Sequence, residues 1–318
     1  MIVGSIAALG FTGGLSFFAP GPITPQLVDH YGISYATAGL LTSLVALVHV
    51  VFPIPVSTLI GRVDLKLLIM LGALANCAPL LSFLAVDSYP LLLAIRVVYG
   101  FGFVILFPAA APLFMQWFQS RELPLVNGSF VTMTSLGVAT SSFGMSPLSD
   151  AIGWESALCV PGGLALLSAG AWLVFGRTRL RANETQSSSA MRRLREVLRA
   201  RTTLLLVAAD AGPLALLTVS LAWLPTYYSN VREMSPAKAG ALVGIVSLSG
   251  VIALIVASLA TMHFERHRPF LVIPGIIVGF AGLGTLLLAD SAAVYLAVVA
   301  LSFATWLYVP VLVTIPME

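Results

Sequence analysis

The sequence carries very little charge. Of its 318 residues, 9% are charged and 58% are hydrophobic, whereas a soluble globular chain carries about 25% charged residues. A water-facing surface needs many more Lys, Arg, Asp and Glu side chains than are present, so most of the outer surface is expected to face lipid. The shortage of charge argues against a soluble protein and indicates an integral membrane protein.

Cysteine and the common enzyme motifs are also scarce. Cys77 and Cys159 are the two cysteines, and both lie in or beside apolar stretches, where a small buried residue is the simplest interpretation. The segment HFERH places Glu265 midway between its histidines, which is not the metalloprotease arrangement. Neither a nucleophile elbow nor a phosphate-binding loop is present. We therefore expect no enzyme, no cofactor, no metal site and no nucleic-acid partner.

What the chain does contain is a series of long apolar stretches. A bilayer core takes roughly 20 apolar residues of helix, and runs such as 204–209 do not alternate in polarity as strands of a membrane barrel would. The predicted spans are 2–27, 37–60, 65–86, 90–117, 122–148, 154–176, 203–229, 236–262, 269–289 and 291–316. The sequence thus predicts an all-α membrane protein with about ten transmembrane helices.

The basic residues indicate the orientation of these spans. Of the 16 Lys and Arg residues, 13 lie in loops on the same side as the N-terminus. The opposite loops hold Arg232 and Lys238, and Arg96 lies inside a span. Because basic residues are retained on the cytoplasmic side, we expect the N-terminus to be cytoplasmic. The protein is expected in the plasma membrane, which is the inner membrane of a cell with two membranes.

An internal repeat organises the spans. The segment SYATAGLL at 34–41 recurs as SPAKAGAL at 235–242, and ten of 24 aligned positions are identical at a spacing of 201 residues. Duplicated halves of this kind occur in secondary transporters, whose solute sites lie near the bilayer midplane where the halves meet. The second half holds four spans against six in the first, so we expect a truncated chain, or a fragment of a protein of about 400 residues.

This repeat divides the chain into three parts. Residues 1–176 are expected to form a six-helix bundle, and residues 203–318 an incomplete bundle of four helices. Residues 177–202 form a basic cytoplasmic linker. Within the linker, 191–201 has the spacing of a short helix lying on anionic lipid, and a solvated basic loop is the alternative.

Local motifs add a family resemblance. Arg96, Gly100 and Gly102 in RVVYGFG resemble the Arg-x-x-x-Gly-x-Gly signature of the major facilitator superfamily, and Arg62 and Lys66 fit its loop signature after the second span. The resemblance implies a six-plus-six helical bundle, with the arginine associated with proton or substrate coupling. Within that superfamily, the segments around Pro25 and at 117–122 are similar to cyanate-permease-type carriers.

Ionisable groups inside the spans are candidates for the solute site, because a charge in hydrocarbon costs at least about 2.5 kcal/mol. Arg96 is expected either to attract an anion or couple transport, or to act as a hydrogen-bonded clasp between helices. Asp210 is expected either to exchange protons or to reach water near the cytoplasmic face. His49 either titrates or is a neutral histidine bonded to the next helix.

Aromatic residues and prolines complete the candidate site. Tyr99, Trp223 and Trp306 are further candidates for solute contact, and the two tryptophans lie on spans that line the cavity in the resembled family. Interfacial aromatic belts are the alternative. Pro20 and Pro25 interrupt the first span, and such interruptions are tolerated where backbone lines a cavity, which predicts a gating role.

These observations predict a secondary transporter that moves a small solute by alternating access. An anionic solute is inferred from Arg96 alone, and proton coupling is left open. The alternative is a non-transporting membrane receptor or an inactive, truncated remnant of a transporter.

Overall fold

A computed structural model describes residues 2–60, 62–119, 122–179, 199–234, 236–261, 268–287 and 291–307. Apart from an isolated bridge between Ile60 and Val63, the described residues form helices and their connections, so the all-α prediction is confirmed. The chain divides into two compact units, Met1–Arg192 and Arg193–Glu318. Most of the predicted linker, including 191–198 of the predicted surface helix, lies outside the described residues, as does the HFERH segment at 263–267.

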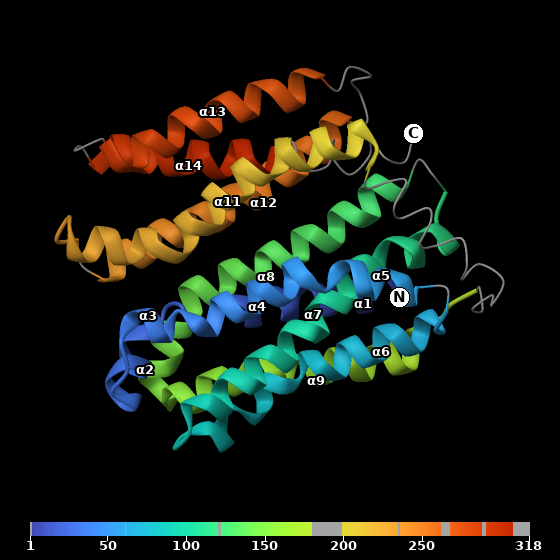
Figure 1. Cartoon of the computed structure of the whole chain (residues 1–318), viewed down its shortest axis with the longest axis horizontal. Coiled ribbons are helices and arrows are strands. Elements are labelled where there is room, and N and C mark those ends of the chain that lie inside the picture. The colour runs from blue at the N-terminus through green and yellow to red at the C-terminus, as the bar shows by residue number, and fades with distance from the viewer. Residues whose placement is uncertain are drawn as a thin grey trace. The chain divides into compact units, whose positions relative to one another are not determined.

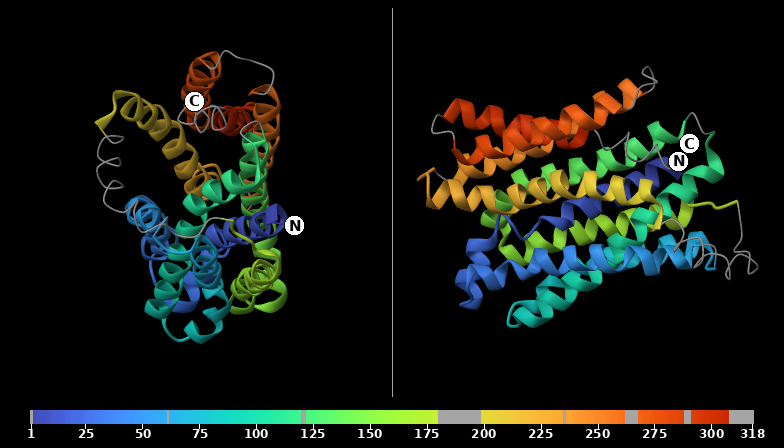
Figure 2. Two further views of the ribbon diagram at one scale, coloured as in Figure 1. Left: turned by 90° about the vertical axis from the view of Figure 1, so that its right-hand side faces the viewer. Right: turned by 45° about the horizontal axis from the view of Figure 1, so that its top comes forward.

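The first unit is a bundle whose helices run roughly along one direction (Figures 1 and 2). Its elements are α1 (Ile2–Phe17), α2 (Thr24–Tyr31), α3 (Tyr35–Ala38), α4 (Leu40–Val51), α5 (Pro53–Leu59), α6 (Leu65–Asn76), the 3-10 helix η1 (Ala78–Ala85), α7 (Tyr89–Trp117), α8 (Leu123–Ile152) and α9 (Trp154–Phe175). The described helices of the second unit are α11 (Arg201–Asn230), α12 (Pro236–Thr261), α13 (Arg268–Leu287) and α14 (Ser291–Leu307). Each of the ten predicted spans falls on one or more of these helices.

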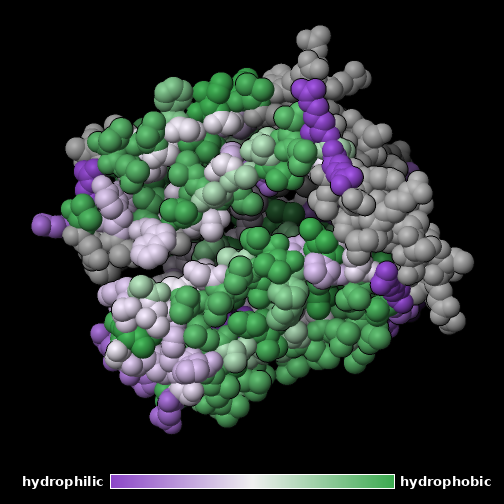
Figure 3. Space-filling model, viewed as in Figure 1, coloured by the Kyte–Doolittle hydropathy of each residue, from purple (hydrophilic) through white to green (hydrophobic). Residues whose placement is uncertain are grey.

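Within the described residues, four helical stretches are long and apolar enough to cross a membrane by length and composition alone. They are Leu65–Ala85, Tyr89–Trp117, Trp154–Phe175 and Thr203–Ser220, and α2 with α3–α4 adds a fifth if that pair, bent by 117°, counts as one span. Large apolar side chains such as Val50 and Leu167 are 77% and 71% exposed. Figure 3 shows hydrophobic side chains over much of the visible face, with hydrophilic ones mostly near helix ends. This surface suits a lipid environment.

The first predicted span is not a continuous helix, and an interruption at its prolines is what the sequence predicts. The helix α1 ends at Phe17, and α2 begins at Thr24. Pro20 and Pro22 lie in the connection, and proline supplies no backbone N–H to the carbonyl four residues earlier and disfavours helical geometry at the residue before it. The break in the helix follows from these two prolines.

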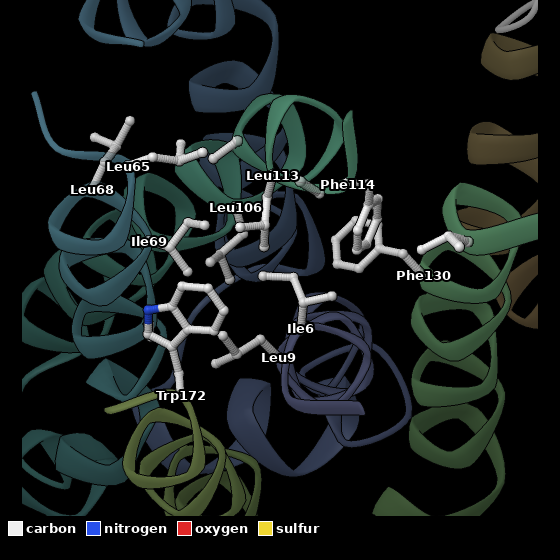
Figure 4. Packing of buried hydrophobic residues seen from close by; sticks show 14 of the residues in the cluster. Ile6, Leu9, Leu65, Leu68, Ile69, Leu106, Leu113, Phe114, Phe130 and Trp172 are labelled. Carbon is white, nitrogen blue, oxygen red and sulfur yellow. The ribbon is translucent and has the colours of Figure 1, made fainter. Parts of the chain in front are cut away.

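The core of the first unit is packed around α1, α6, α7 and α9 (Figure 4). Ile6, Ile69, Leu106 and Phe114 are fully buried together, and the Trp172 ring closes the cluster from α9. The helix α8 reaches α1 through Gly137, where any Cβ would collide with the carbonyl oxygen of Phe11. A side chain at this position would push the two helices apart.

The internal repeat is visible in the contacts as well as in the sequence. In the first unit, the Tyr31 hydroxyl donates to the carbonyl of Ala85 at 2.7 Å. In the second unit, Arg232 Nη2 donates to the carbonyl of Leu286 at 2.9 Å. Both the donor and the acceptor stand 201 positions after their counterparts. The same pair of elements is therefore tied together at the same point in each unit.

Candidate functional site

Arg96 lies in the middle of three helices of the first unit. Its side chain projects from α7 and is 2% exposed. Its Nε donates to the carbonyl of Leu41 in α4 at 3.0 Å, while Nη1 and Nη2 donate to the carbonyls of Ser16 and Phe17 at 2.6 and 2.7 Å. One guanidinium group thus joins α7 to α1 and to α4.

The partners of Arg96 follow from the break in α1. The last carbonyls of a helix have no partner within it, and Pro20 lacks the N–H that would otherwise bond the Ser16 carbonyl. Arg96 supplies donors for Ser16 and for the neighbouring Phe17. A positive charge is also favoured at the C-terminal end of a helix, where the helix dipole is negative. We call this arrangement the Arg96 clasp.

The other residues of the sequence signature also lie at helix contacts. The Tyr99 hydroxyl donates to the carbonyl of Gly13 in α1, and the Arg96 guanidinium lies 4.9 Å from the centre of the Tyr99 ring. Gly100 faces α4, where a Cβ would meet the Val48 side chain at 3.4 Å. Gly102 faces α6 so closely that any Cβ would collide with its backbone. The signature therefore sets how α7 packs on three neighbours.

His49 projects from α4 and lies between two phenylalanine rings. The ring centroids of Phe17 and Phe103 are 5.5 and 4.9 Å from that of His49. Nδ1 lies 3.0 Å from the carbonyl of Val45 in the same helix, so the expected bond to the next helix is not what the structure shows. Nε2 has no hydrogen-bond partner within the described part of the chain.

The remaining intramembrane candidates belong to the second unit. Asp210 and Trp223 are both on α11 and are separated along it by about 20 Å at the rise of an α-helix, and the Trp223 side chain is 54% exposed. Trp306 on α14 packs closely over Gly250 of α12. Since Gly250 stands 201 positions after His49, the indole of Trp306 covers the position that repeats His49 in the second unit.

The predicted gating and loop residues lie at helix ends. Pro20 is buried, and its carbonyl accepts from the Thr24 hydroxyl at 3.0 Å. Pro25 lies exposed in the first turn of α2. Arg62 is exposed before α6, and the Lys66 carbonyl accepts from Trp172 Nε1 at 3.3 Å. The structure does not bring these four residues together with Arg96, except that Pro20 adjoins the carbonyls that Arg96 binds.

Sequence reasoning missed the aromatic surroundings of His49. Phe17 and Phe103 lie on helices far apart in the sequence, and phenylalanines in apolar spans carry no signal of a shared site. The spacing of Phe103 and Phe107, which places both on one face of a helix, is the one local hint. Among the residues that the structure describes, no three His, Cys, Asp or Glu side chains gather where a metal could bind.

Comparisons with known proteins place this geometry in a family. The sequence profile of the Major Facilitator Superfamily matches residues 6–318. An uncharacterized protein of Campylobacter jejuni is 25% identical over 70% of this chain and 68% of its own length. A probable L-galactonate transporter of Escherichia coli is 21% identical over 73% of this chain, and the match spans 55% of that transporter.

Two groups of solved structures share the fold. The fucose:proton symporter of Escherichia coli, in the outward conformation, superposes with a TM-score of 0.74 at 17% identity, covering 98% of this chain and 82% of the symporter. A bacterial homologue of the human lysosomal transporter Spinster, inward-facing and unoccupied, gives 0.70 at 16% identity, covering 99% of this chain and 74% of the homologue. The narrower resemblance to cyanate-permease-type carriers stays a prediction. The chain belongs to the Major Facilitator Superfamily and has the fold of its membrane transporters.

Proposed function

We propose that this chain is a secondary transporter that moves a small solute by alternating access, with its site open to each side of the membrane in turn. The observation that carries the proposal is the broken helix α1, whose loose end is held by Arg96. Hydrogen bonds from a charged group contribute about 1.5–3 kcal/mol each, so this end of α1 is tied to α7 and moves with it. Residues at the ends of elements can absorb the backbone change of a hinge, and the interruption after Phe17 takes that role in the proposal.

The proposed solute is a small organic anion. The N–H groups of Arg96 bond to carbonyls, and no carboxylate is paired with it among the described residues. A buried cation without a counter-ion gives a positive potential in the low-dielectric interior, which favours an anion. The probable L-galactonate transporter is named for such an anion.

Proton coupling is the second element of the proposal. One structural neighbour is titled a fucose:proton symporter, and this chain has titratable groups inside two of its predicted spans, His49 and Asp210. We assign proton exchange to one of these two groups. We also propose that residues 1–176 and 203–318 are the two bundles, joined by a cytoplasmic linker at 177–202, with the N-terminus cytoplasmic as the distribution of basic residues predicts.

The alternative of a non-transporting receptor or inactive remnant is not favoured, because one relative is named a probable transporter and the structural neighbours are a symporter and a homologue of a transporter. Uptake by purified chain in proteoliposomes tests the choice directly. A panel of labelled organic anions and their neutral analogues would be offered with and without an inward proton gradient. We expect uptake of at least one anion that exceeds uptake of its neutral analogue. Absence of uptake for every panel member under both conditions would contradict the proposal.

A further inference from the structure

A row of five rings crosses the first unit beside the Arg96 clasp. The aromatic row, as we name it, consists of Phe17 of α1, His49 of α4, Phe103 and Phe107 of α7, and Phe130 of α8. Successive ring centroids are 5.5, 4.9, 5.1 and 5.3 Å apart in that order. Such distances and tilted or edge-to-face geometries are those of favourable aromatic contacts. Four helices therefore contribute to one continuous aromatic surface.

The aromatic row has a buried base and an exposed rim. Phe103 and Phe130 lie directly on the backbone of α1, since a Cβ at Gly13 would come within 2.5 Å of the Phe103 ring and one at Gly10 within 2.8 Å of the Phe130 ring. These two phenylalanines are 5% and 3% exposed. Phe107, between them in the row, is 39% exposed, so it is the accessible phenylalanine of α7 in the row.

One polar atom in the aromatic row is left without a partner. His49 Nε2 is buried and makes no hydrogen bond within the described residues. A buried polar group without a partner costs about 1–3 kcal/mol, and such groups in native proteins usually await a water, an ion or a ligand. The rings that flank His49 offer no hydrogen-bonding atom. Apolar walls with a single placed polar group are typical of small-molecule sites.

Resting on the transport function proposed above, we infer that the aromatic row of the first unit binds the solute and that the solute is a small organic acid with a flat aromatic ring. The solute ring packs against Phe107, and a hydroxyl of the solute donates to His49 Nε2, because Nδ1 carries the proton that it donates to the Val45 carbonyl. The charge of the acid is favoured by Arg96, which is joined to the row through the Tyr99 ring. The Tyr99 and Phe103 rings are stacked with their centroids 6.1 Å apart, and the Arg96 guanidinium lies 4.9 Å from the centre of the Tyr99 ring.

Matched acids separate ring recognition from charge recognition. Benzoate and cyclohexanecarboxylate carry the same charge and nearly the same bulk, but only benzoate is flat and aromatic. Aromatic contacts contribute about 0.5–1.5 kcal/mol beyond area burial. We therefore expect calorimetric titration of the purified chain in detergent to give a benzoate Kd about three- to tenfold lower than the cyclohexanecarboxylate Kd.

Three variants locate the binding. Phe107→Leu keeps an apolar side chain and is expected to remove the preference for benzoate. His49→Phe keeps a ring but removes the acceptor Nε2, so it is expected to weaken binding of 4-hydroxybenzoate, which offers a hydroxyl donor, and to leave binding of benzoate unchanged. Phe143→Leu is the matched control, because Phe143 is a 43% exposed phenylalanine of α8 outside the aromatic row. Gel filtration and the thermal unfolding midpoint establish that each variant is folded, and His49→Phe tests the site if Phe107→Leu does not fold.

The outcomes distinguish the site from the transport function. Equal affinities for the two acids, no binding of benzoate, or the same loss in Phe143→Leu as in Phe107→Leu would each overturn the inference. Uptake of organic acids without preference for a ring would also overturn it while leaving the transporter proposal intact. Ring-selective binding that depends on Phe107, with no uptake of any panel acid, would retain the site and remove the transport function.

Discussion

At the scale of single residues, Arg96 compensates for the backbone N–H that Pro20 lacks. Proline ends the hydrogen bonding of α1, and the arginine from α7 provides the missing donor to Ser16. The sequence allowed two interpretations of Arg96, an anion-attracting charge and a clasp between helices. The observed bonds belong to the clasp, and the uncompensated charge keeps the first interpretation as part of the proposed function. The carbonyl partners could not be predicted. Every residue has a backbone carbonyl, so the residue type does not indicate which carbonyls a distant side chain binds.

This compensation predicts a specific coupling between the two residues. Arg96→Met leaves the carbonyls of Ser16 and Phe17 buried without donors, which is expected to destabilise the protein by at least about 2 kcal/mol. Pro20→Ala provides a new N–H for the Ser16 carbonyl, so the loss caused by Arg96→Met should be smaller in that background by about 1 kcal/mol or more. Thermal unfolding in detergent measures all four proteins of the cycle.

Arg179→Met is the control for that cycle, because Arg179 is exposed and lies 4.0 Å over the Trp117 ring at a helix end. Its substitution is expected to change stability by no more than about 0.5 kcal/mol. Equal destabilisation by Arg96→Met in both backgrounds would show that the arginine does not replace the donor that Pro20 lacks.

At the scale of elements, the predicted spans coincide with helices, but the first three spans are interrupted. The first divides into α1 and α2, the second divides into α3, α4 and α5 at Gly39 and Phe52, and the third changes from α6 to the 3-10 helix η1, whose first turn contains Pro79. Hydropathy reports the length of an apolar stretch and is insensitive to a kink, so it predicts where a span lies and not whether the helix is continuous. The role of each glycine was equally ambiguous in the sequence. The same residue occurs where two helices pack closely and where the Cβ position faces open space.

Two glycines of α8 provide a matched pair for that ambiguity. Gly137 meets the backbone of α1, whereas nothing lies within 4 Å of the Cβ position of Gly144. Gly137→Ala is expected to lower the unfolding midpoint, since α1 and α8 must separate. Gly144→Ala should leave it unchanged or raise it, because alanine favours a helix over glycine by up to about 1 kcal/mol. Similar midpoints for the two variants would contradict the close packing of α1 on α8.

At the scale of the whole molecule, duplication explains the shared construction of the two units. The repeat was found from ten identities in 24 positions, and the structure adds contacts at the same spacing between residues that are not identical. Tyr31 and Arg232 differ chemically but tie the same pair of elements. Sequence comparison cannot detect this kind of equivalence, because a phenol and a guanidinium are different residue types that can both donate to a carbonyl.

The two ties predict additive effects on stability. Tyr31→Phe and Arg232→Met each remove one side-chain donor, at a cost of about 0.5–3 kcal/mol. Because the two sites belong to different units and share no partner, their effects should add within about 0.5 kcal/mol. Unfolding of the single and double variants in detergent provides the values. A double variant no less stable than the weaker single variant would show that the ties do not act independently.

We propose the break in α1, held by Arg96, as the hinge of a transporter. The most direct test is initial uptake by the double variant Pro20→Ala/Arg96→Met in proteoliposomes, with the anion that the wild-type chain takes up best. The double variant regains a donor for Ser16, so it should be more stable than Arg96→Met alone. Because it lacks the held break, its uptake rate should be at least about tenfold lower than that of the wild-type chain, which corresponds to a barrier higher by about 1.4 kcal/mol. Uptake at the wild-type rate by this variant would contradict the account.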